Sequence, residues 1–365
     1  MLWRDCEGLT NGGRFAMLLL LLSMLTACGG GGGGDGSGDS ADDGGTDNTG
    51  DDTTPQDPGT GTTGYRVSRV RYDFDNNGVF EGIREFAYAS DGRIMQERYT
   101  YSDDGAEDVY LAGTLSNSIG LDPVDETIEY SYDSEGRLQT WVGYNSDFRQ
   151  INTYTYNYNN DNLITRIDVS VEDGSGAVTS QYSHTLNYTG QRLTTHVMTE
   201  EGETTPILEY AISYDGAGYV LTNDQTTTQT GLVSSYAYTY LTNGRPDTVT
   251  ETVSLLPDYR MSFEFGYTAN NQPAYLNFIT LGAGNDNRYS FEEQYDSNGR
   301  HVARQVDDLI DGSIDAVAEI EWEEGVCVAV LDWHPRTLVS DTVDTASPYI
   351  PGTGYVWLRH CTDGI

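Results

Sequence analysis

The stretch YDFDNNGVFEGIRE, residues 72–85, places oxygen-bearing side chains at alternate positions ahead of Gly78. The oxygen donors of this stretch are Asp73, Asp75, Asn77, the carbonyl of Val79, and Glu81. Calcium takes about six to eight oxygen ligands, and this spacing matches the opening of a calcium loop. Position twelve of such a loop is Arg84 here, where a bidentate Glu belongs, so an Asp/Asn-rich β-turn is the alternative. Calcium is the one cofactor that the sequence suggests.

A second acidic stretch, VDDLIDGSID at 306–315, repeats this pattern more weakly through Asp307, Asp311 and Asp315. The sequence contains no His-Glu-x-x-His, no Gly-x-Ser-x-Gly and no phosphate-binding loop. Paired carboxylates are uninformative, because 57 Asp and Glu residues place some pair close together in any fold. The sequence therefore predicts a protein that is not an enzyme.

The chain has a formal charge of −38, from 57 acidic and 19 basic residues, and every basic residue is Arg. A surface this anionic repels nucleic acid and anionic lipid, so the charge argues against DNA or RNA as partners. Cations, cationic proteins and neutral molecules remain compatible with it.

An apolar run, FAMLLLLLSML at 15–25, follows Arg4 and Arg14 and is typical of a signal-peptide core. As a helix it would span about 16 Å, too short for a bilayer core of about 30 Å. The run ends in LTAC, which resembles the lipobox of bacterial lipoproteins. The resemblance implies cleavage before Cys28 and acylation of that residue by palmitate-type chains. Because Gly29 follows, it further implies an outer-membrane lipoprotein of a Gram-negative bacterium, periplasmic or surface-exposed.

Residues 29–64 contain Gly, Asp and Thr in abundance, no basic residue and no large apolar side chain. Such a segment cannot bury enough surface to fold and behaves as a tether with a reach of roughly 30–35 Å. We therefore divide the N-terminal region into a signal peptide, 1–27, and a disordered tether, 28–64, that carries the lipidated Cys28 and attaches the protein to the membrane.

Cys327 and Cys361 are the cysteines that remain after the signal peptide and the lipidation site are set aside. An even pair in an oxidising compartment predicts a disulfide, which would close a loop of about 35 residues. Two free thiols or a metal-binding pair are the alternatives, although no His at ligand spacing completes a zinc set.

An aromatic residue recurs ahead of a turn with a step of about 27 residues, after a longer first gap that holds an insertion, 102–129. These anchor residues are Tyr88, Tyr132, Tyr158, Tyr188, Tyr214, Tyr240, Tyr267, Tyr295 and Trp322. The aromatic residues alternate along segments such as YTYNY, 154–158, with the period of two that β-strands show. We therefore expect each repeat to form a β-hairpin.

Gly or Asn lies four residues after most anchors, and Arg often follows it. The clearest turns are Tyr88, Gly92 and Arg93; Tyr132, Gly136 and Arg137; Tyr240, Gly244 and Arg245; and Tyr295, Gly299 and Arg300. Gly and Asn tolerate the left-handed backbone that short hairpin turns need. Recurrence at one repeat position predicts a structural role: a cross-strand ladder of tyrosines, and arginines that pair with a carboxylate of a neighbouring repeat.

The copies YDSEGR, 132–137, and YDSNGR, 295–300, resemble the YD or RHS repeat family, whose core reads approximately Tyr-Asp-x-x-Gly-Arg. The resemblance covers about residues 75–335 and implies strand pairs stacked into a long curling sheet. Large members of that family wrap the sheet into a shell around a toxin domain. About nine copies are too few for a shell, and no toxin segment follows them, so we do not carry the shell role over.

The expected fold is all-β, with about nine stacked antiparallel β-hairpin repeats over 65–325 forming a curling sheet or open solenoid. Neighbouring hairpins must stack, because a two-strand unit cannot bury its apolar face alone. Residues 326–365 break the repeat, and we expect a disulfide-closed C-terminal cap over the last sheet edge. A membrane-spanning barrel is not expected, because strands such as SFEEQY offer no lipid-facing apolar row.

Three classes of function remain. The favoured one is a lipid-anchored cell-envelope protein whose repeat array is a non-catalytic structural or adhesive binding module, with a glycan or another surface protein as partner. The second is a carbohydrate-binding or polysaccharide-active surface protein, suggested by 27 Tyr and 5 Trp. The third is a toxin-system-associated remnant of the RHS family.

Overall fold

The computed structural model describes residues 62–101, 127–144, 150–328, 331–333 and 355–357, apart from positions 74, 174, 271, 283–286 and 309. Within these ranges the chain is all-β, as the sequence predicts, and contains no helix. The predicted signal peptide, the tether up to residue 61, Cys28 and most of the insertion at 102–129 lie outside the described residues.

Eighteen strands form one sheet, and two short strands form a second. The large sheet consists of β1 (Thr62–Asp73), β2 (Gly82–Tyr88), β3 (Ile94–Tyr101), β4 (Thr127–Tyr132), β5 (Leu138–Tyr144), β6 (Gln150–Tyr158), β7 (Ile164–Glu172), β8 (Val178–Thr189), β9 (Arg192–Glu200), β10 (Leu208–Tyr214), β11 (Val220–Thr227), β12 (Leu232–Tyr240), β13 (Pro246–Val253), β14 (Leu256–Tyr267), β15 (Pro273–Leu281), β16 (Asn287–Tyr295), β17 (His301–Asp308) and β18 (Ala316–Cys327). The small sheet consists of β19 (Leu331–Trp333) and β20 (Tyr355–Trp357).

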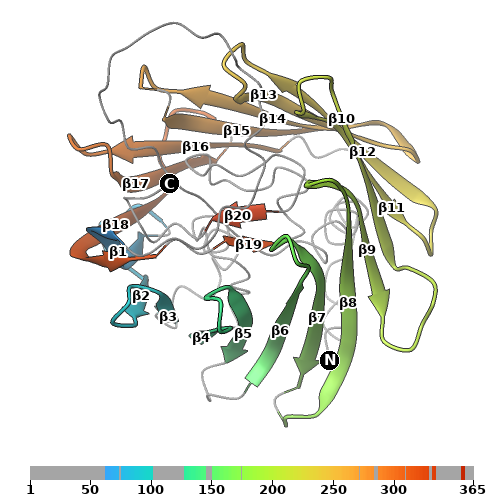
Figure 1. Ribbon diagram of the computed structural model, residues 1–365. Coiled ribbons are helices and arrows are strands. Elements are labelled where there is room, and N and C mark those ends of the chain that lie inside the picture. The colour runs from blue at the N-terminus through green and yellow to red at the C-terminus, as the bar shows by residue number, and fades with distance from the viewer. Residues whose placement is uncertain are drawn as a thin grey trace, which may run out of the picture.

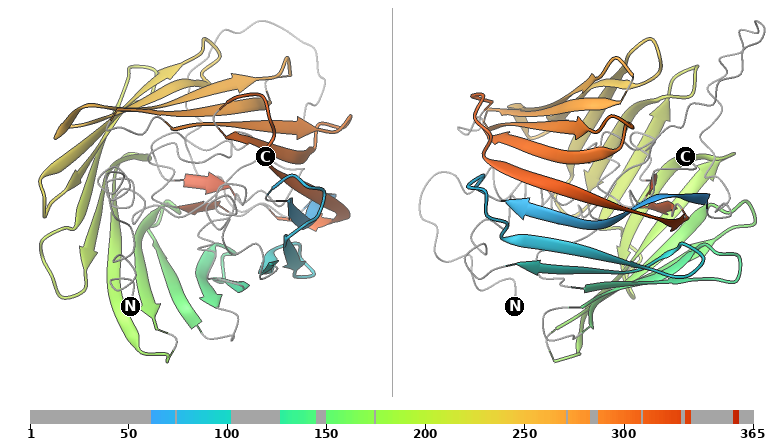
Figure 2. Two further views of the ribbon diagram at one scale, coloured as in Figure 1. Left: turned by 180° about the vertical axis from the view of Figure 1, so that it is seen from behind. Right: turned by 90° about the vertical axis from the view of Figure 1, so that its left-hand side faces the viewer.

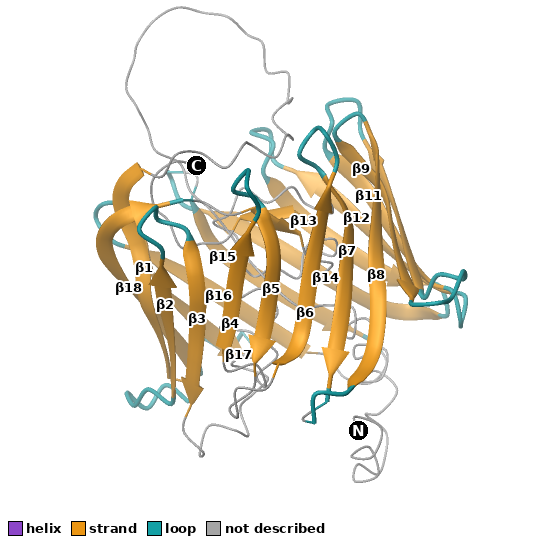
Figure 3. Ribbon diagram, turned by 60° about the horizontal axis from the view of Figure 1, so that its bottom comes forward, coloured by secondary structure: helices purple, strands orange, loops and turns teal. Residues whose placement is uncertain are grey.

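The large sheet closes on itself into an 18-stranded antiparallel β-barrel (Figures 1 and 3). Each strand pairs with the next one along the chain, and β1 pairs with both β2 and β18. The closing pair runs from Thr62 opposite Cys327 to Asp73 opposite Val317. The expected curling sheet or open solenoid is therefore wrong.

Pairing between the first and the last strand explains this error. β1 precedes the first turn motif, so the repeat count left out the strand that completes the ring. Its arginines face glutamates of β18: Arg66 Nε lies 2.7 Å from Glu323 Oε1, and Arg71 Nη2 lies 2.7 Å from Glu319 Oε2. Because closure removes both sheet edges, the predicted cap over the last edge, 326–365, is also wrong in that role.

Side chains alternate between a buried and an exposed face along the strands. In β10, Leu208, Tyr210 and Ile212 are buried, whereas Glu209 and the other intervening residues are exposed. A closed sheet has only one face that its own strands enclose, so the buried face is the inner wall of the barrel. Buried residues from nearly all the strands join in one core cluster on this wall.

The two short strands lie inside the ring, where Leu331 pairs with Trp357 (Figures 1 and 2). The chain leaves β18 against the β2–β3 turn, because the N–H of Val328 donates to the carbonyl of Gly92 at 3.0 Å. A Cβ on Gly92 would lie 2.7 Å from the backbone of Val326, and its φ is +92°. Only glycine therefore fits the point where the C-terminal segment crosses the turn.

Candidate functional site

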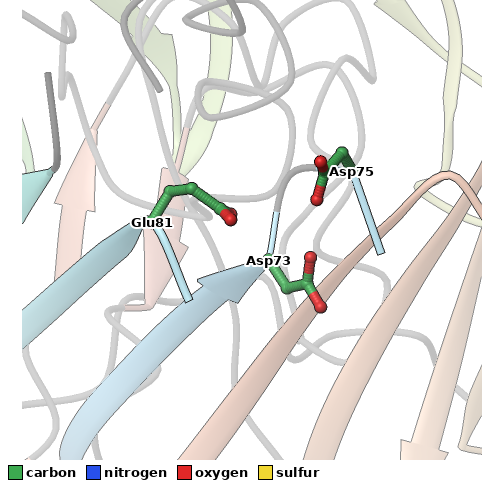
Figure 4. A group of neighbouring side chains, drawn as sticks. All are labelled: Asp73, Asp75 and Glu81. Carbon is green, nitrogen blue, oxygen red and sulfur yellow. The ribbon is translucent and has the colours of Figure 1, made fainter. Parts of the chain in front are cut away.

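The predicted calcium loop connects β1 to β2, and its carboxylates converge (Figure 4). One oxygen each from Asp73, Asp75 and Glu81 lies within 4.8 Å of the other two. Asp73 ends β1 and is 4% exposed, whereas Asp75 is exposed. Three carboxylates at this spacing offer the hard oxygen ligands that calcium prefers.

Backbone hydrogen bonds to Asp73 shape this loop. Its Oδ1 accepts from the N–H of Asn77 at 3.0 Å, and its Oδ2 accepts from the N–H of Gly78 at 2.8 Å. The side-chain oxygen of Asn77 accepts from the N–H of Val79 at 2.7 Å. Asn77 Oδ1, a predicted ligand atom, therefore accepts a hydrogen bond within the turn, and the roles of Asn77 and the Val79 carbonyl as ligands stay predictions.

The β17–β18 loop has the same backbone plan. Asp307 accepts from the N–H groups of Asp311 at 3.0 Å and Gly312 at 2.8 Å, as Asp73 does in the first loop. The two loops touch, because Asn76 Nδ2 donates to the carbonyl of Ile314 at 2.8 Å. Among the described residues, the predicted set Asp307, Asp311 and Asp315 does not converge as a metal-sized group. The two loops therefore share their backbone hydrogen bonds but differ in their carboxylates, which, in the described part of the chain, come together only in the β1–β2 loop.

Eight of the nine predicted anchors share one contact at the turn end of the barrel. Each of the eight donates to a backbone carbonyl at 2.7–2.9 Å, which belongs to the middle of β1 for Tyr88 and to the start of the second strand of the preceding hairpin for the others. The pairs are Tyr88–Val67, Tyr132–Ile94, Tyr158–Leu138, Tyr188–Ile164, Tyr214–Leu193, Tyr240–Val220, Tyr267–Pro246 and Trp322–His301. The ring of Tyr295 lies 5.5 Å from that of His301. The hydroxyls therefore join neighbouring hairpins.

The turns use a left-handed residue, with φ of +92° at Gly92, +86° at Gly136, +81° at Gly244 and Gly299, and +62° at Asn162. In the copies that have Asp after the anchor tyrosine and Arg after the glycine, the Asp side chain accepts hydrogen bonds from that Arg of the same turn. Asp133 accepts from the N–H and the Nε of Arg137 at 3.0 and 2.8 Å, and burial is outweighed by these hydrogen bonds, so the pKa of Asp133 is lowered.

The sequence suggested that the arginines after the turn glycines pair with a carboxylate of a neighbouring repeat. Arg93, Arg137 and Arg300 instead pair with Asp91, Asp133 and Asp296 of their own turns. The guanidinium groups of the turn arginines also cover the tyrosine of the next repeat: Arg93 over Tyr132, Arg137 over Tyr158, Arg245 over Tyr267 and, across the closing strands, Arg300 over Tyr65. These cation–π contacts therefore connect the turn of one hairpin to the tyrosine of a neighbouring one.

Sequence reasoning missed a set of buried charged side chains on the inner wall. The side chains of Glu293 on β16 and Arg304 on β17 are each 1% exposed and form an ion pair, and His301 Nε2 lies 2.5 Å from Glu293 Oε2. Burial opposes the charge of Glu293, but Arg304 and His301 outweigh it and lower its pKa to about 2. A similar cluster joins Arg84 to Glu97, which accepts from Tyr130 Oη at 2.7 Å.

Two further buried histidines, His184 on β8 and His196 on β9, also lie on the inner wall. His184 Nδ1 lies 2.7 Å from His196 Nε2, and the two rings stack with centroids 4.9 Å apart. Nothing in the sequence signals this pair, because the two residues are separated by a turn and each resembles an isolated histidine in a strand.

The cysteines are only partly visible. Cys327, at the end of β18, is 3% exposed and is disulfide-bonded. Its predicted partner, Cys361, and the lipidation site, Cys28, lie outside the described residues, so both assignments stay predictions. Within the part of the chain that is described, no helix is long and apolar enough to cross a membrane.

Comparison with known proteins gives weak structural neighbours only. The sequence matches no protein-family model and no curated protein. The crystal structure of TcdB2–TccC3, an RHS/YD-repeat toxin component, shares 9% identity over 72% of this chain, with a TM-score of 0.34, and the match spans 16% of that chain. A porin-like protein from Bacteroides uniformis shares 14% identity over 73% of this chain and 100% of its own length, with a TM-score of 0.35. TM-scores this low carry no argument about function.

Proposed function

We propose that the chain is a lipid-anchored protein of the bacterial cell envelope whose closed barrel acts as a non-catalytic structural or adhesive binding module. A β-barrel is compatible with an outer-membrane or envelope protein. The observation that carries the proposal is the polar outer face of the barrel, combined with the lipobox and the tether of the sequence.

The outer face is charged where a membrane-spanning barrel would be apolar. Bacterial barrels that span the membrane carry an outward apolar band about 25 Å tall. Here the intervening residues of the strands include exposed Glu209, Glu264 and Glu292, and ion pairs such as Arg69–Glu85 cross the outer surface of β1 and β2. Such a surface favours a barrel that stands in water, held near the membrane by acyl chains on Cys28 and the tether.

The anchor tyrosines favour a scaffold over a sugar-binding surface. Their hydroxyls donate to the carbonyls of neighbouring hairpins, and several of their faces are covered by arginines. Because these hydroxyls and ring faces already contact the protein, they are not available to stack on a sugar. We therefore propose that partners bind to the acidic outer surface. Cationic proteins and neutral surface glycans are the partner classes that suit its charge.

Labelling of growing cells with tagged palmitate tests the anchor. We expect label in the wild-type chain, none in a Cys28→Ser variant, and movement of that variant from the outer-membrane fraction to the soluble fraction. A matched Cys6→Ser variant should behave as wild type. Unlabelled wild-type protein, or a Cys28→Ser variant that remains in the membrane fraction, would contradict lipid anchoring.

Pull-down from envelope extracts and a glycan array, both with the purified full-length protein, test the binding role. Binding that is weakened by salt is expected from an acidic surface. Turnover of a polysaccharide by the purified protein would instead favour the polysaccharide-active alternative and contradict a non-catalytic role.

A further inference from the structure

The buried histidine pair occupies an unusual place in the barrel. His184 and His196 are 3% and 0% exposed, and their facing nitrogens are 2.7 Å apart. One imidazole must donate and the other accept, so the contact forms only while at least one of them is neutral. One added proton still leaves a neutral ring that can accept from the cationic one; a second proton removes that acceptor and leaves two cationic rings in contact.

The ionisable groups that face the pair are tyrosines. Tyr182 of β8 meets His184 edge-on at 5.4 Å, and Tyr210 of β10 stacks on His196 at 4.8 Å. Further along the wall, Tyr236 of β12 donates to Glu251 of β13 at 2.9 Å. The carboxylate of Glu251 is thus already bound by a phenol of β12.

Apolar residues lie opposite both histidines in the neighbouring strands. Ile167 of β7 and Met198 of β9 lie opposite His184, and Leu186 of β8 lies opposite His196. Burial lowers the pKa of His184 to about 3, and burial together with the facing His184 lowers that of His196. Both rings are therefore neutral near neutral pH, and acid charges them only at a cost to the fold.

His196 also lies in one of the shortest strand pairings in the barrel. β9 pairs with β10 only from Thr195 opposite Ala211 to Met198 opposite Leu208. On its other side, β9 pairs with β8 along the whole of Tyr182 to Thr189. Tyr210, directly opposite His196, is within this short pairing, so a disturbance of His196 acts at one of the less extensive backbone pairings of the barrel.

We propose that the His184–His196 pair is an acid-sensitive lock that holds β9 to β10 and releases this joint of the barrel when the pair is protonated. The closed state has two neutral, hydrogen-bonded imidazoles stacked on Tyr210. The open state takes up protons, separates the rings and frees the β9–β10 joint, while the charge-compensated cluster at Glu293 keeps the β16–β17 joint closed.

Amide hydrogen exchange of the purified full-length protein tests the lock, with rates corrected for the intrinsic pH dependence of exchange. Below about pH 6.5 the opening constant of β9 and β10 should rise by about tenfold per pH unit for each proton taken up. Strands β16 and β17 serve as the internal reference and should stay protected over this range. A His196→Gln variant keeps only His184 as a titratable ring of the pair, so its response should fall to that of one proton at most, whereas Thr195→Ser on the same strand should retain the wild-type response.

Three results would overturn the proposal: β9–β10 protection that is independent of pH, acid opening that begins at β16–β17, or a His196→Gln variant that opens as the wild type does. If His196→Gln does not fold, nitrogen-15 NMR of the histidine rings in the wild-type protein decides. Two rings that stay neutral and hydrogen-bonded until β9–β10 opens support the lock; two rings that become protonated near pH 6.5 with β9–β10 still closed overturn it.

Discussion

Two polar clusters on the inner wall of the barrel differ in how they tolerate burial. The His184–His196 pair on β8 and β9 is buried in its neutral form. The Glu293–Arg304–His301 cluster on β16 and β17 is buried as balanced opposite charges, which lower the pKa of Glu293 to about 2. The difference teaches that one wall can hold polar groups either by suppressing a charge or by compensating it, and that the two solutions fail under different conditions.

Removing one partner from the charged cluster should have the largest effect. An Arg304→Met variant leaves Glu293 buried without its main counter-charge, and we expect the free energy of unfolding to fall by about 3–5 kcal/mol. The double variant Arg304→Met/Glu293→Leu should recover much of this loss, because it removes the stranded charge as well. Urea unfolding followed by tyrosine and tryptophan fluorescence measures both; equal stability of the single variant and wild type would show that the pair is not a balanced charge.

Acid should weaken this cluster in a window below that of the histidine pair. Glu293 has a folded pKa of about 2 against an ordinary value of 4.5, so its contribution is complete above pH 4.5 and is lost as the pH falls toward 2. The loss is on the order of 3 kcal/mol. Urea midpoints between pH 5 and pH 2 should fall steeply for wild type and more gently for a Glu293→Gln variant; parallel profiles would refute the assignment.

The acidic loop at Asp73 represents a third arrangement, because no described arginine forms an ion pair with Asp73 or Asp75. A cation from solution would supply the compensating positive charge that Arg304 supplies to Glu293. If calcium binds there, at ten times its dissociation constant it should stabilise the protein by about 1.4 kcal/mol. Asp75→Asn should abolish the thermal shift, whereas Asp311→Asn in the matching loop should leave it intact. No shift with calcium and none with a chelator would refute calcium binding.

The turns could be predicted from sequence because each is formed by residues of one hairpin. Tyr132, Gly136 and Arg137 lie within one hairpin, and the left-handed glycine and the period of two are visible without the fold. Closure of the barrel depends on Thr62 meeting Cys327 across nearly the whole chain, and no short pattern records such a distance. A period fixes the repeat unit but not the number of strands that completes a ring.

The inner-wall clusters were missed for a related reason. Glu293, Arg304 and His301 read as ordinary strand residues in a chain with 57 acids, and only the register of β16 against β17 brings them together. The acidic loop could be predicted because its three carboxylates come from one short segment. The matching loop at Asp307 shows where sequence prediction fails: it has the same backbone hydrogen bonds, but among the described residues its carboxylates do not come together as a metal-sized group.

The smallest effect should come from a neutral hydrogen bond at the turn end of the barrel. Tyr132→Phe removes the bond from the phenol to the carbonyl of Ile94, 2.7 Å long, but keeps the ring under Arg93. We expect a loss of about 1 kcal/mol that is the same at pH 7 and pH 5, because neither partner ionises in that range.

Tyr275→Phe is the matched control for this last substitution. Tyr275 is 42% exposed on the outer face, where its ring lies over Gly266, so its hydroxyl can bond to water in both states. Its substitution should change the urea midpoint very little. A Tyr132→Phe loss that grows on acidification would mean that the turn end is coupled to the histidine pair, and the two clusters of the inner wall would then not be the sole origin of the acid response.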